Sequence, residues 1–216
     1  LLREPYGCFE QTSTTNYPNV LITEYLNESN QAKPDVSRRA KDLMEKGYAR
    51  LTGYECPNTP TKAKKGFEWF GAADRPHEAL TAYGLLQFTD MSRVFPVDPV
   101  MLTRTKAFLL DSRDGKGGFK RNSVALDSFG RAPDHVTAAY IVWAVTEAEK
   151  GDAAESDVTT ELDAAFKLAT DGPAANDPYF LALVANALLT RGRTADGVAL
   201  LKTVAGLQAK DGSLPG

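Results

Sequence analysis

Apolar and polar positions along the chain form two kinds of segment, and the first kind has helical periodicity on one face. Over 35–51, Ala40, Leu43 and Leu51 fall on a single stripe, while Lys41 and other charged residues lie away from it. An apolar stripe with a period near 3.6 residues is typical of an amphipathic helix that covers a core. The same period recurs over 98–111, 157–169 and 195–209. These four segments are predicted to be outer, amphipathic helices.

Segments of the second kind are apolar nearly all round and alternate with the first. They are 79–88, 136–145 and 179–189. A helix without a polar face must be buried on every side. Two of these inner segments also resemble each other, because 80–83 (Leu-Thr-Ala-Tyr) aligns with 137–140 (Thr-Ala-Ala-Tyr). Repeated pairs of outer and inner helices predict an all-α fold that is either a solenoid or a closed ring. The fully apolar inner helices favour the closed ring, an α/α toroid with one ring of helices inside the other.

The two histidines, His77 and His135, each stand at the start of an inner segment, beside Glu78 and Asp134 respectively. Acidic neighbours suit the positive end of a helix dipole, so both histidines are expected to cap or satisfy helix N-termini. Their spacing matches no compact set of metal ligands, and no metal site or cofactor is predicted.

Composition narrows the range of partners. The chain has 216 residues, 43% of them hydrophobic, and a formal net charge of −3. This is enough apolar sequence for a core. A weakly acidic chain without a long basic run is not typical of a protein that binds nucleic acid or an anionic membrane. No apolar stretch is long enough to cross a bilayer, so no membrane insertion is predicted.

The chain has only two cysteines, Cys8 and Cys56, so a framework of several disulfides is excluded. Their number permits one bridge between them. Cys56 stands in a predicted loop just before Pro57. It is expected to be a free thiol, because a bridge would occupy the sulfur of Cys8, which has a possible reaction partner closer in the sequence.

The possible reaction partner of Cys8 is Gln11, three residues further along the chain. A spacing of three residues places both side chains on one turn, and Gly7 gives the backbone freedom just before the sulfur. A thiolate held against the carboxamide carbon attacks it as an effectively intramolecular nucleophile. The thioester formed in this way would acylate an incoming amine or hydroxyl, and water has to be kept from it until that moment. The alternative is that Cys8 is an ordinary small hydrophobe.

The full stretch 5–11, Pro-Tyr-Gly-Cys-Phe-Glu-Gln, resembles the internal thioester motif of the alpha-2-macroglobulin and complement family. The similarity covers most of the chain and includes 25–28, 80–83, the turn at 117–119 and 136–140. The sequence departs from the most familiar members at Phe9, where they have glycine, and matches the bulky variants of bacterial and some invertebrate members.

The resemblance implies a fold and a function. The fold is the α/α toroid of the thioester domain, with 1–216 as one domain of a larger protein and the last helices of the ring beyond Gly216. The function is that of a single-use covalent protease inhibitor rather than an enzyme, with a Cys8–Gln11 thioester that is attacked by lysine amines of a target protease. The other implied partners are the remaining domains of the parent macroglobulin, and the implied location is extracellular or periplasmic.

A further residue follows from the complement branch, in which a histidine after the Gly-x-Phe turn passes the acyl group to hydroxyls. Counted from Gly117-Gly118-Phe119, this position is Asp127. The absence of histidine there implies direct attack by amines. Asp127 can equally be a solvated loop carboxylate.

Two other functions stay open. A toroid enzyme would need a metal triad or a pair of acids at the centre of the ring, and the sequence offers no convincing candidates. A non-covalent binding module on the same scaffold would differ only in the state of Cys8. Three aromatic residues near the sulfur, Tyr6, Phe9 and Tyr17, are candidates for excluding water from it.

Overall fold

The computed structural model describes residues 2–31, 33–58, 63–71, 75–122, 132–152 and 154–215. Within these ranges it contains eight helices and one β-hairpin. Packing divides the chain into two compact units, Leu1–Asp111 and Ser112–Gly216. The prediction that 1–216 forms one domain stays a prediction.

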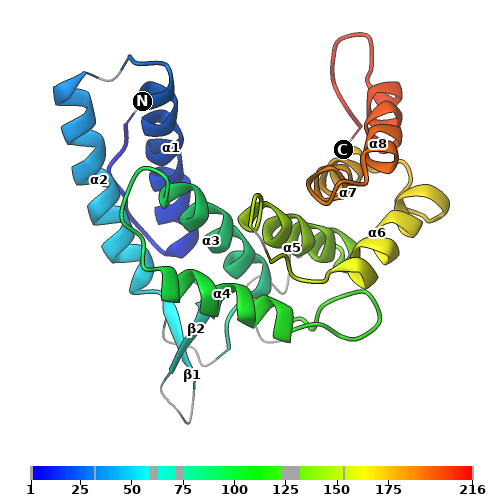
Figure 1. Cartoon of the computed structure of the whole chain (residues 1–216), viewed down its shortest axis with the longest axis horizontal. Coiled ribbons are helices and arrows are strands. Elements are labelled where there is room, and N and C mark those ends of the chain that lie inside the picture. Colours follow the sequence, from blue (N-terminus) through cyan, green and yellow to red (C-terminus); the bar gives the residue numbers. More distant parts are fainter. Residues whose placement is uncertain are drawn as a thin grey trace. The chain divides into compact units, whose positions relative to one another are not determined.

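The first unit contains four helices and the hairpin (Figure 1). They are α1 (Phe9–Glu28), α2 (Pro34–Thr52), β1 (Glu55–Asn58), β2 (Ala63–Phe67), α3 (Glu78–Met91) and α4 (Pro99–Asp111). Helix α1 packs between α2 and α3, and α3 also contacts α4. The residues before α1 run back along it in the direction opposite to the helix (Figure 1).

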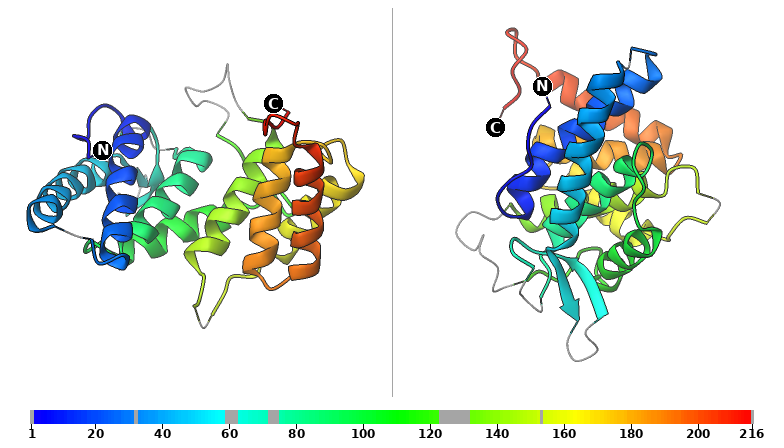
Figure 2. Two further views of the ribbon diagram at one scale, coloured as in Figure 1. Left: turned by 90° about the horizontal axis from the view of Figure 1, so that it is seen from above. Right: turned by 90° about the vertical axis from the view of Figure 1, so that its left-hand side faces the viewer.

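The second unit is built from four helices. They are α5 (Asp134–Ala148), α6 (Thr159–Asp171), α7 (Pro178–Thr190) and α8 (Thr194–Leu207). Figure 2 shows α7 between α5 and α8, and α6 packs against both α5 and α7. Its core includes the fully buried side chains of Ile141, Phe180 and Leu181.

All seven helices predicted from periodicity are confirmed, with ends that shift by a few residues. The contrast between the two kinds also holds. Ten of the fourteen residues of α3 are buried, whereas five of the nineteen residues of α2 are buried, all of them on the predicted stripe. The sequence pattern therefore identified which helices are enclosed and which face solvent.

Helix α1 was not predicted, because the face that it buries is polar. Thr12, Asn16 and Asn19 are fully buried on it. Asn19 accepts the backbone N–H of Arg3 at 3.1 Å and donates to the Arg3 carbonyl at 2.9 Å. The backbone N–H and carbonyl of Arg3 are thus paired with a side chain of α1 rather than with a neighbouring strand. Backbone groups that pack against a helix in this way need polar side chains on that helix. Asn16 occupies the space where a side chain at Gly47 would lie, so α1 approaches α2 closely.

The hairpin of β1 and β2 was also missed. The strands are antiparallel, with Glu55 opposite Phe67, and a register shift follows Glu55. The Glu55 carboxylate is buried and pairs with Arg104 of α4 through two bonds of 2.5 and 2.7 Å. Short strands that are stabilised by a distant helix carry little local signal in a sequence.

The start of α7 carries a side-chain cap. Asp177 precedes the helix, and its Oδ1 accepts the backbone N–H of Phe180 at 3.0 Å. Replacing an N-cap aspartate by alanine typically costs about 1 kcal/mol, and we expect Asp177→Ala to lower the free energy of unfolding by about that amount. Urea denaturation measures this loss. The control is Asp152→Ala, which replaces an exposed aspartate. Equal stability of the two variants would show that the cap contributes nothing.

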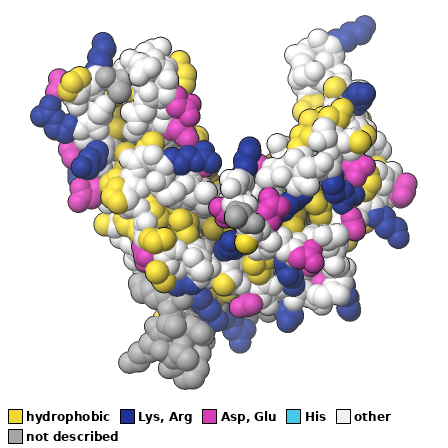
Figure 3. Space-filling model, viewed as in Figure 1, with side chains coloured by type: hydrophobic (Ala, Val, Ile, Leu, Met, Phe, Trp, Pro, Cys, Tyr) yellow, Lys and Arg dark blue, Asp and Glu magenta, His cyan; other side chains and the backbone are white. Residues whose placement is uncertain are grey.

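Basic and acidic side chains are interspersed over the visible face of the molecule (Figure 3). None of the described helices is both long enough and apolar enough to cross a membrane.

Candidate functional site

Cys8 and Gln11 meet at the first turn of α1. Cys8 is the N-cap, with an extended backbone at φ −76° and ψ −175°, and Gln11 is the third helical residue. The Gln11 Oε1 atom accepts the Cys8 backbone N–H at 3.2 Å, and the Cys8 side chain faces the Gln11 backbone N–H. This reciprocal arrangement is a capping box, which turns the Gln11 carboxamide back toward Cys8.

Gly7 lies directly beneath the Gln11 side chain. Its φ is +80°, a conformation that residues with a side chain rarely adopt. A Cβ atom at this position would lie 2.0 Å from Gln11 Oε1 and 2.8 Å from Gln11 Cδ. Only glycine therefore allows the carboxamide to lie against the backbone that leads into the sulfur.

The Gly7 carbonyl is held by three donors from two other parts of the unit. It accepts hydrogen bonds from the Tyr54 hydroxyl at 2.6 Å, from Arg50 Nε at 3.0 Å and from Thr12 Oγ1 at 3.3 Å. These contacts fix the peptide between Gly7 and Cys8. Arg50 and Tyr54 lie more than forty positions from Gly7, and no motif in the sequence marks them.

Trp69 holds the other side of the turn. Its carbonyl accepts the Phe9 backbone N–H at 2.9 Å, and its indole Nε1–H donates to Glu10 Oε2 at 3.1 Å. Trp69 is partly buried and packs against the core of the first unit. The bond to Glu10 is an additional contact, for which the sequence contains no local signal.

The three aromatic residues proposed to exclude water have different roles. Phe9 is fully buried and stacks on Phe67 with ring centroids 4.9 Å apart, so it anchors the first turn of α1 in the core. Tyr6 is 61% exposed. Tyr17 donates a hydrogen bond to Asp90 and packs against Tyr83. Of the three, only Phe9 contributes to packing directly at the motif.

The motif lies at the surface of its unit, with Cys8 half-buried and Gln11 exposed. Negative charge that develops on the sulfur would lie at the positive end of α1, with the Arg50 guanidinium bound one residue earlier. Near Glu10, burial raises the pKa of the Tyr83 phenol, and the charge of Glu10 raises this pKa further. The phenol is therefore neutral at physiological pH.

The two histidines differ from each other. His77 caps α3 as predicted, because its Nδ1 accepts the Leu80 backbone N–H at 3.2 Å, and its ring lies 4.8 Å from that of Trp69. The prediction for His135 was wrong. The N-cap of α5 is Pro133, which makes no side-chain cap, and His135, the second residue of the helix, packs edge-on against Phe180 of α7.

Two candidates from the sequence remain, Asp127 and Cys56. Asp127 lies outside the described residues. Cys56 is buried and shares no disulfide with Cys8. Among the residues that the structure describes, no three His, Cys, Asp or Glu side chains gather where they could hold a metal ion.

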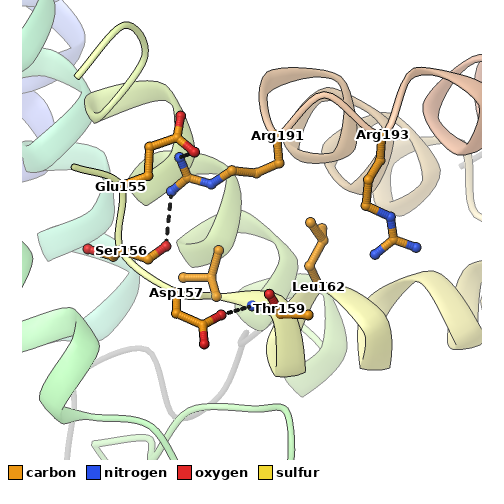
Figure 4. Close-up of a pocket in the computed structure, with 8 residues that line it drawn as sticks. Glu155, Ser156, Asp157, Thr159, Leu162, Arg191 and Arg193 are labelled. Atoms are coloured by element: carbon orange, nitrogen blue, oxygen red, sulfur yellow. Dashed lines mark hydrogen bonds and ion pairs between the residues drawn. The ribbon is translucent and has the colours of Figure 1, made fainter. Parts of the chain in front are cut away.

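A pocket of about 310 Å³ lies in the second unit, between the start of α6 and the end of α7 (Figure 4). Its two cations each have carboxylate partners. Arg191 pairs with Glu149 at 2.5 Å and Glu155 at 2.8 Å, and Arg193 pairs with Asp163 at 2.5 Å. The carboxylates around the pocket outnumber its two cations, so neither guanidinium group is left without a counter-charge.

The comparisons with known proteins agree with the motif. The family described as the A-macroglobulin TED domain matches residues 1–213. Ovostatin from Gallus gallus is 25% identical over 152 residues, which are 68% of this chain and 10% of ovostatin. The chain therefore spans about a tenth of the length of that relative.

Solved structures show the same fold. Native alpha-2-macroglobulin from Escherichia coli, spanning domain MG7 to the C-terminus, matches with a TM-score of 0.66 at 17% identity, over 97% of this chain and 30% of that one. The trypsin-activated protein matches with a TM-score of 0.68 at 18% identity, over 95% and 13% of the two chains. The predicted fold class, an all-α α/α toroid, is confirmed by this likeness. With a family match over nearly its whole length, the chain belongs to the A-macroglobulin TED-domain family.

Proposed function

We propose that this chain forms an internal thioester between Cys8 and Gln11 and uses it once, to capture an attacking protease through a lysine amine. The observation that carries the proposal is the capping box, in which Gln11 Oε1 accepts the Cys8 N–H at 3.2 Å while the carboxamide lies over Gly7. The contacts at the Gly7 carbonyl and at Trp69 support it, because they hold both sides of the turn in place.

The chemistry has two steps. In the first, Cys8 Sγ attacks Gln11 Cδ, the carbon–nitrogen bond breaks and ammonia leaves. In the second, an amine nitrogen attacks the same carbon, the carbon–sulfur bond breaks with its electron pair on Sγ, and an amide joins the target to Gln11. The position of Cys8 at the N-terminus of α1 favours the second step, since helix N-termini stabilise negative charge.

The same proposal implies a larger protein. Gln11 is exposed within its unit, so a thioester at this position would need other parts of the parent macroglobulin to keep water away. We propose that cleavage of a bait region by the protease exposes the bond, and that the parent protein is extracellular or periplasmic. We also propose that Asp127, in place of a histidine, favours amines over hydroxyls.

Peptide mapping before and after methylamine treatment tests the function. We expect the peptide with Cys8 and Gln11 to be lighter by one ammonia, and to gain methylamine while it releases one thiol. Glycerol in the same assay reports on the preference for amines. We expect Cys8→Ala to incorporate no methylamine and to keep its helical circular dichroism.

Two results would contradict the proposal. Incorporation that persists in Cys8→Ala would show that another group reacts. An intact Cys8 thiol and Gln11 carboxamide, both inert to methylamine, would show that the bond does not form, and would favour a non-covalent binding module.

A further inference from the structure

We propose that Glu10, oriented by Trp69, is a positioning residue that selects cationic amines for attack on Gln11. This inference rests on the proposed thioester and names the group that gives it preference for lysine. Glu10 lies between the two residues of the bond, as the second residue of α1, and is exposed.

The orientation of Glu10 distinguishes it from an ordinary surface glutamate, which samples many rotamers. Its Oε2 accepts the indole N–H of Trp69 at 3.1 Å. Trp69 is itself held at two points, since its carbonyl accepts the Phe9 N–H at 2.9 Å and its ring lies 4.8 Å from that of His77. The carboxylate is therefore tied to the same backbone that carries the reacting groups.

The helix places Glu10 beside the acyl group. Phe9 points into the core, and successive residues of a helix turn by about 100°, so Glu10 and Gln11 follow one another around the solvent side. The Glu10 side chain has one oxygen bound to Trp69, which leaves the other available for an incoming ammonium group.

The charges around the turn match the direction of the reaction. The cation Arg50 is bound at the Gly7 carbonyl, just before the sulfur that leaves. The anion Glu10 stands just before Gln11, which receives the amine. Tyr83, which interacts with the charge of Glu10, is neutral and adds no charge of its own. A positively charged nucleophile is therefore attracted to the acyl side of the turn.

The protons balance over the step. The ammonium ion that Glu10 attracts first releases one proton to solvent. The nitrogen then attacks Gln11 Cδ, and the carbon–sulfur bond breaks with its electron pair on Cys8 Sγ. The second proton of the nitrogen passes to the thiolate, so the products are an amide and a thiol.

The test compares charged and neutral nucleophiles on the full chain. Thiol release is followed with methylamine, which is a cation near pH 7.5, and with hydroxylamine, which is largely neutral there. For Glu10→Gln we expect the second-order rate with methylamine to fall about tenfold, the low end for electrostatic attraction of a charged reactant, and the rate with hydroxylamine to stay within about twofold. Glutamine keeps an acceptor for Trp69, so the turn is preserved.

Two further variants sharpen the test. Trp69→Phe keeps the charge but removes the bond that orients it, and we expect a smaller loss that again affects only methylamine. Glu4→Gln is the matched control, because it removes an exposed carboxylate that pairs with Lys46 at 2.8 Å. It should alter neither rate.

The outcomes separate the two proposals. Equal losses with both nucleophiles would show that Glu10 only supports the geometry of the bond, and unchanged rates would show that it has no role, so either result overturns the inference. If Glu10→Gln forms no thioester, added salt on the unmodified chain decides, because screening must slow methylamine and spare hydroxylamine. A chain whose peptide map shows no thioester overturns the proposed function itself.

Discussion

Replacing Gly7 by alanine is expected to abolish the thioester while leaving the fold intact. The new Cβ atom would meet Gln11 Oε1 at 2.0 Å and Gln11 Cδ at 2.8 Å, so the carboxamide must swing away from Cys8. The φ of +80° adds a backbone cost of about 1–2 kcal/mol for any residue with a side chain. Peptide mapping with methylamine measures the loss of the bond, and thermal unfolding measures the cost in stability.

Gly192→Ala is the matched control. Gly192 has a similar φ of +73°, but a Cβ atom there meets nothing within 4 Å. Both variants should lose a similar amount of stability, and only Gly7→Ala should lose methylamine incorporation. Full incorporation in Gly7→Ala would mean that the carboxamide reaches the sulfur from another side, and the site geometry described above would be wrong.

Removing Arg191 is expected to cause the largest loss of stability, about 3–5 kcal/mol, which is typical when one partner of a buried ion pair is removed. Its side chain is only 9% exposed and bonds to Glu149 at 2.5 Å, while that of Glu149 is fully buried. In Arg191→Ala, the Glu149 carboxylate would keep its bonds to Ser156 but would lose the charge of Arg191. Urea denaturation of the full chain measures the change.

An exposed pair in the same unit provides the comparison. Lys150 lies 3.7 Å from Glu147, and its side chain is 64% exposed. Because solvent screens such pairs, Lys150→Ala should change stability little. If Arg191→Ala were no worse than Lys150→Ala, the buried pair would contribute no more than a surface one.

The site has two halves that differ in what holds them. On the sulfur side, Arg50 and Tyr54 hold the Gly7 carbonyl from α2 and the turn that follows it. On the acyl side, Trp69 holds the backbone of Phe9 and the side chain of Glu10. Each half thus depends on residues far from the motif, so substitutions there are expected to alter reactivity without touching Cys8 or Gln11.

The sequence by itself determined the enclosed and exposed helices, because apolar periodicity reports directly which side of a helix is buried. It also placed Cys8 and Gln11 on one turn, since their spacing is a local property. It did not predict α1, because the buried face of that helix is polar and serves the backbone of Arg3 through Asn19. Apolar periodicity detects a helix that buries a hydrophobic face, and it does not detect a helix that buries a polar one.

Only the tertiary structure decided what surrounds the reacting pair. Arg50, Tyr54 and Trp69 come to the first turn of α1 from distant segments, and their hydrogen bonds depend on how α1 packs against α2 and on where the chain after the hairpin runs. The burial of Phe9 and the pairing of Arg191 with Glu149 are likewise set by packing. Such contacts join residues tens of positions apart, so no local pattern in the chain specifies them.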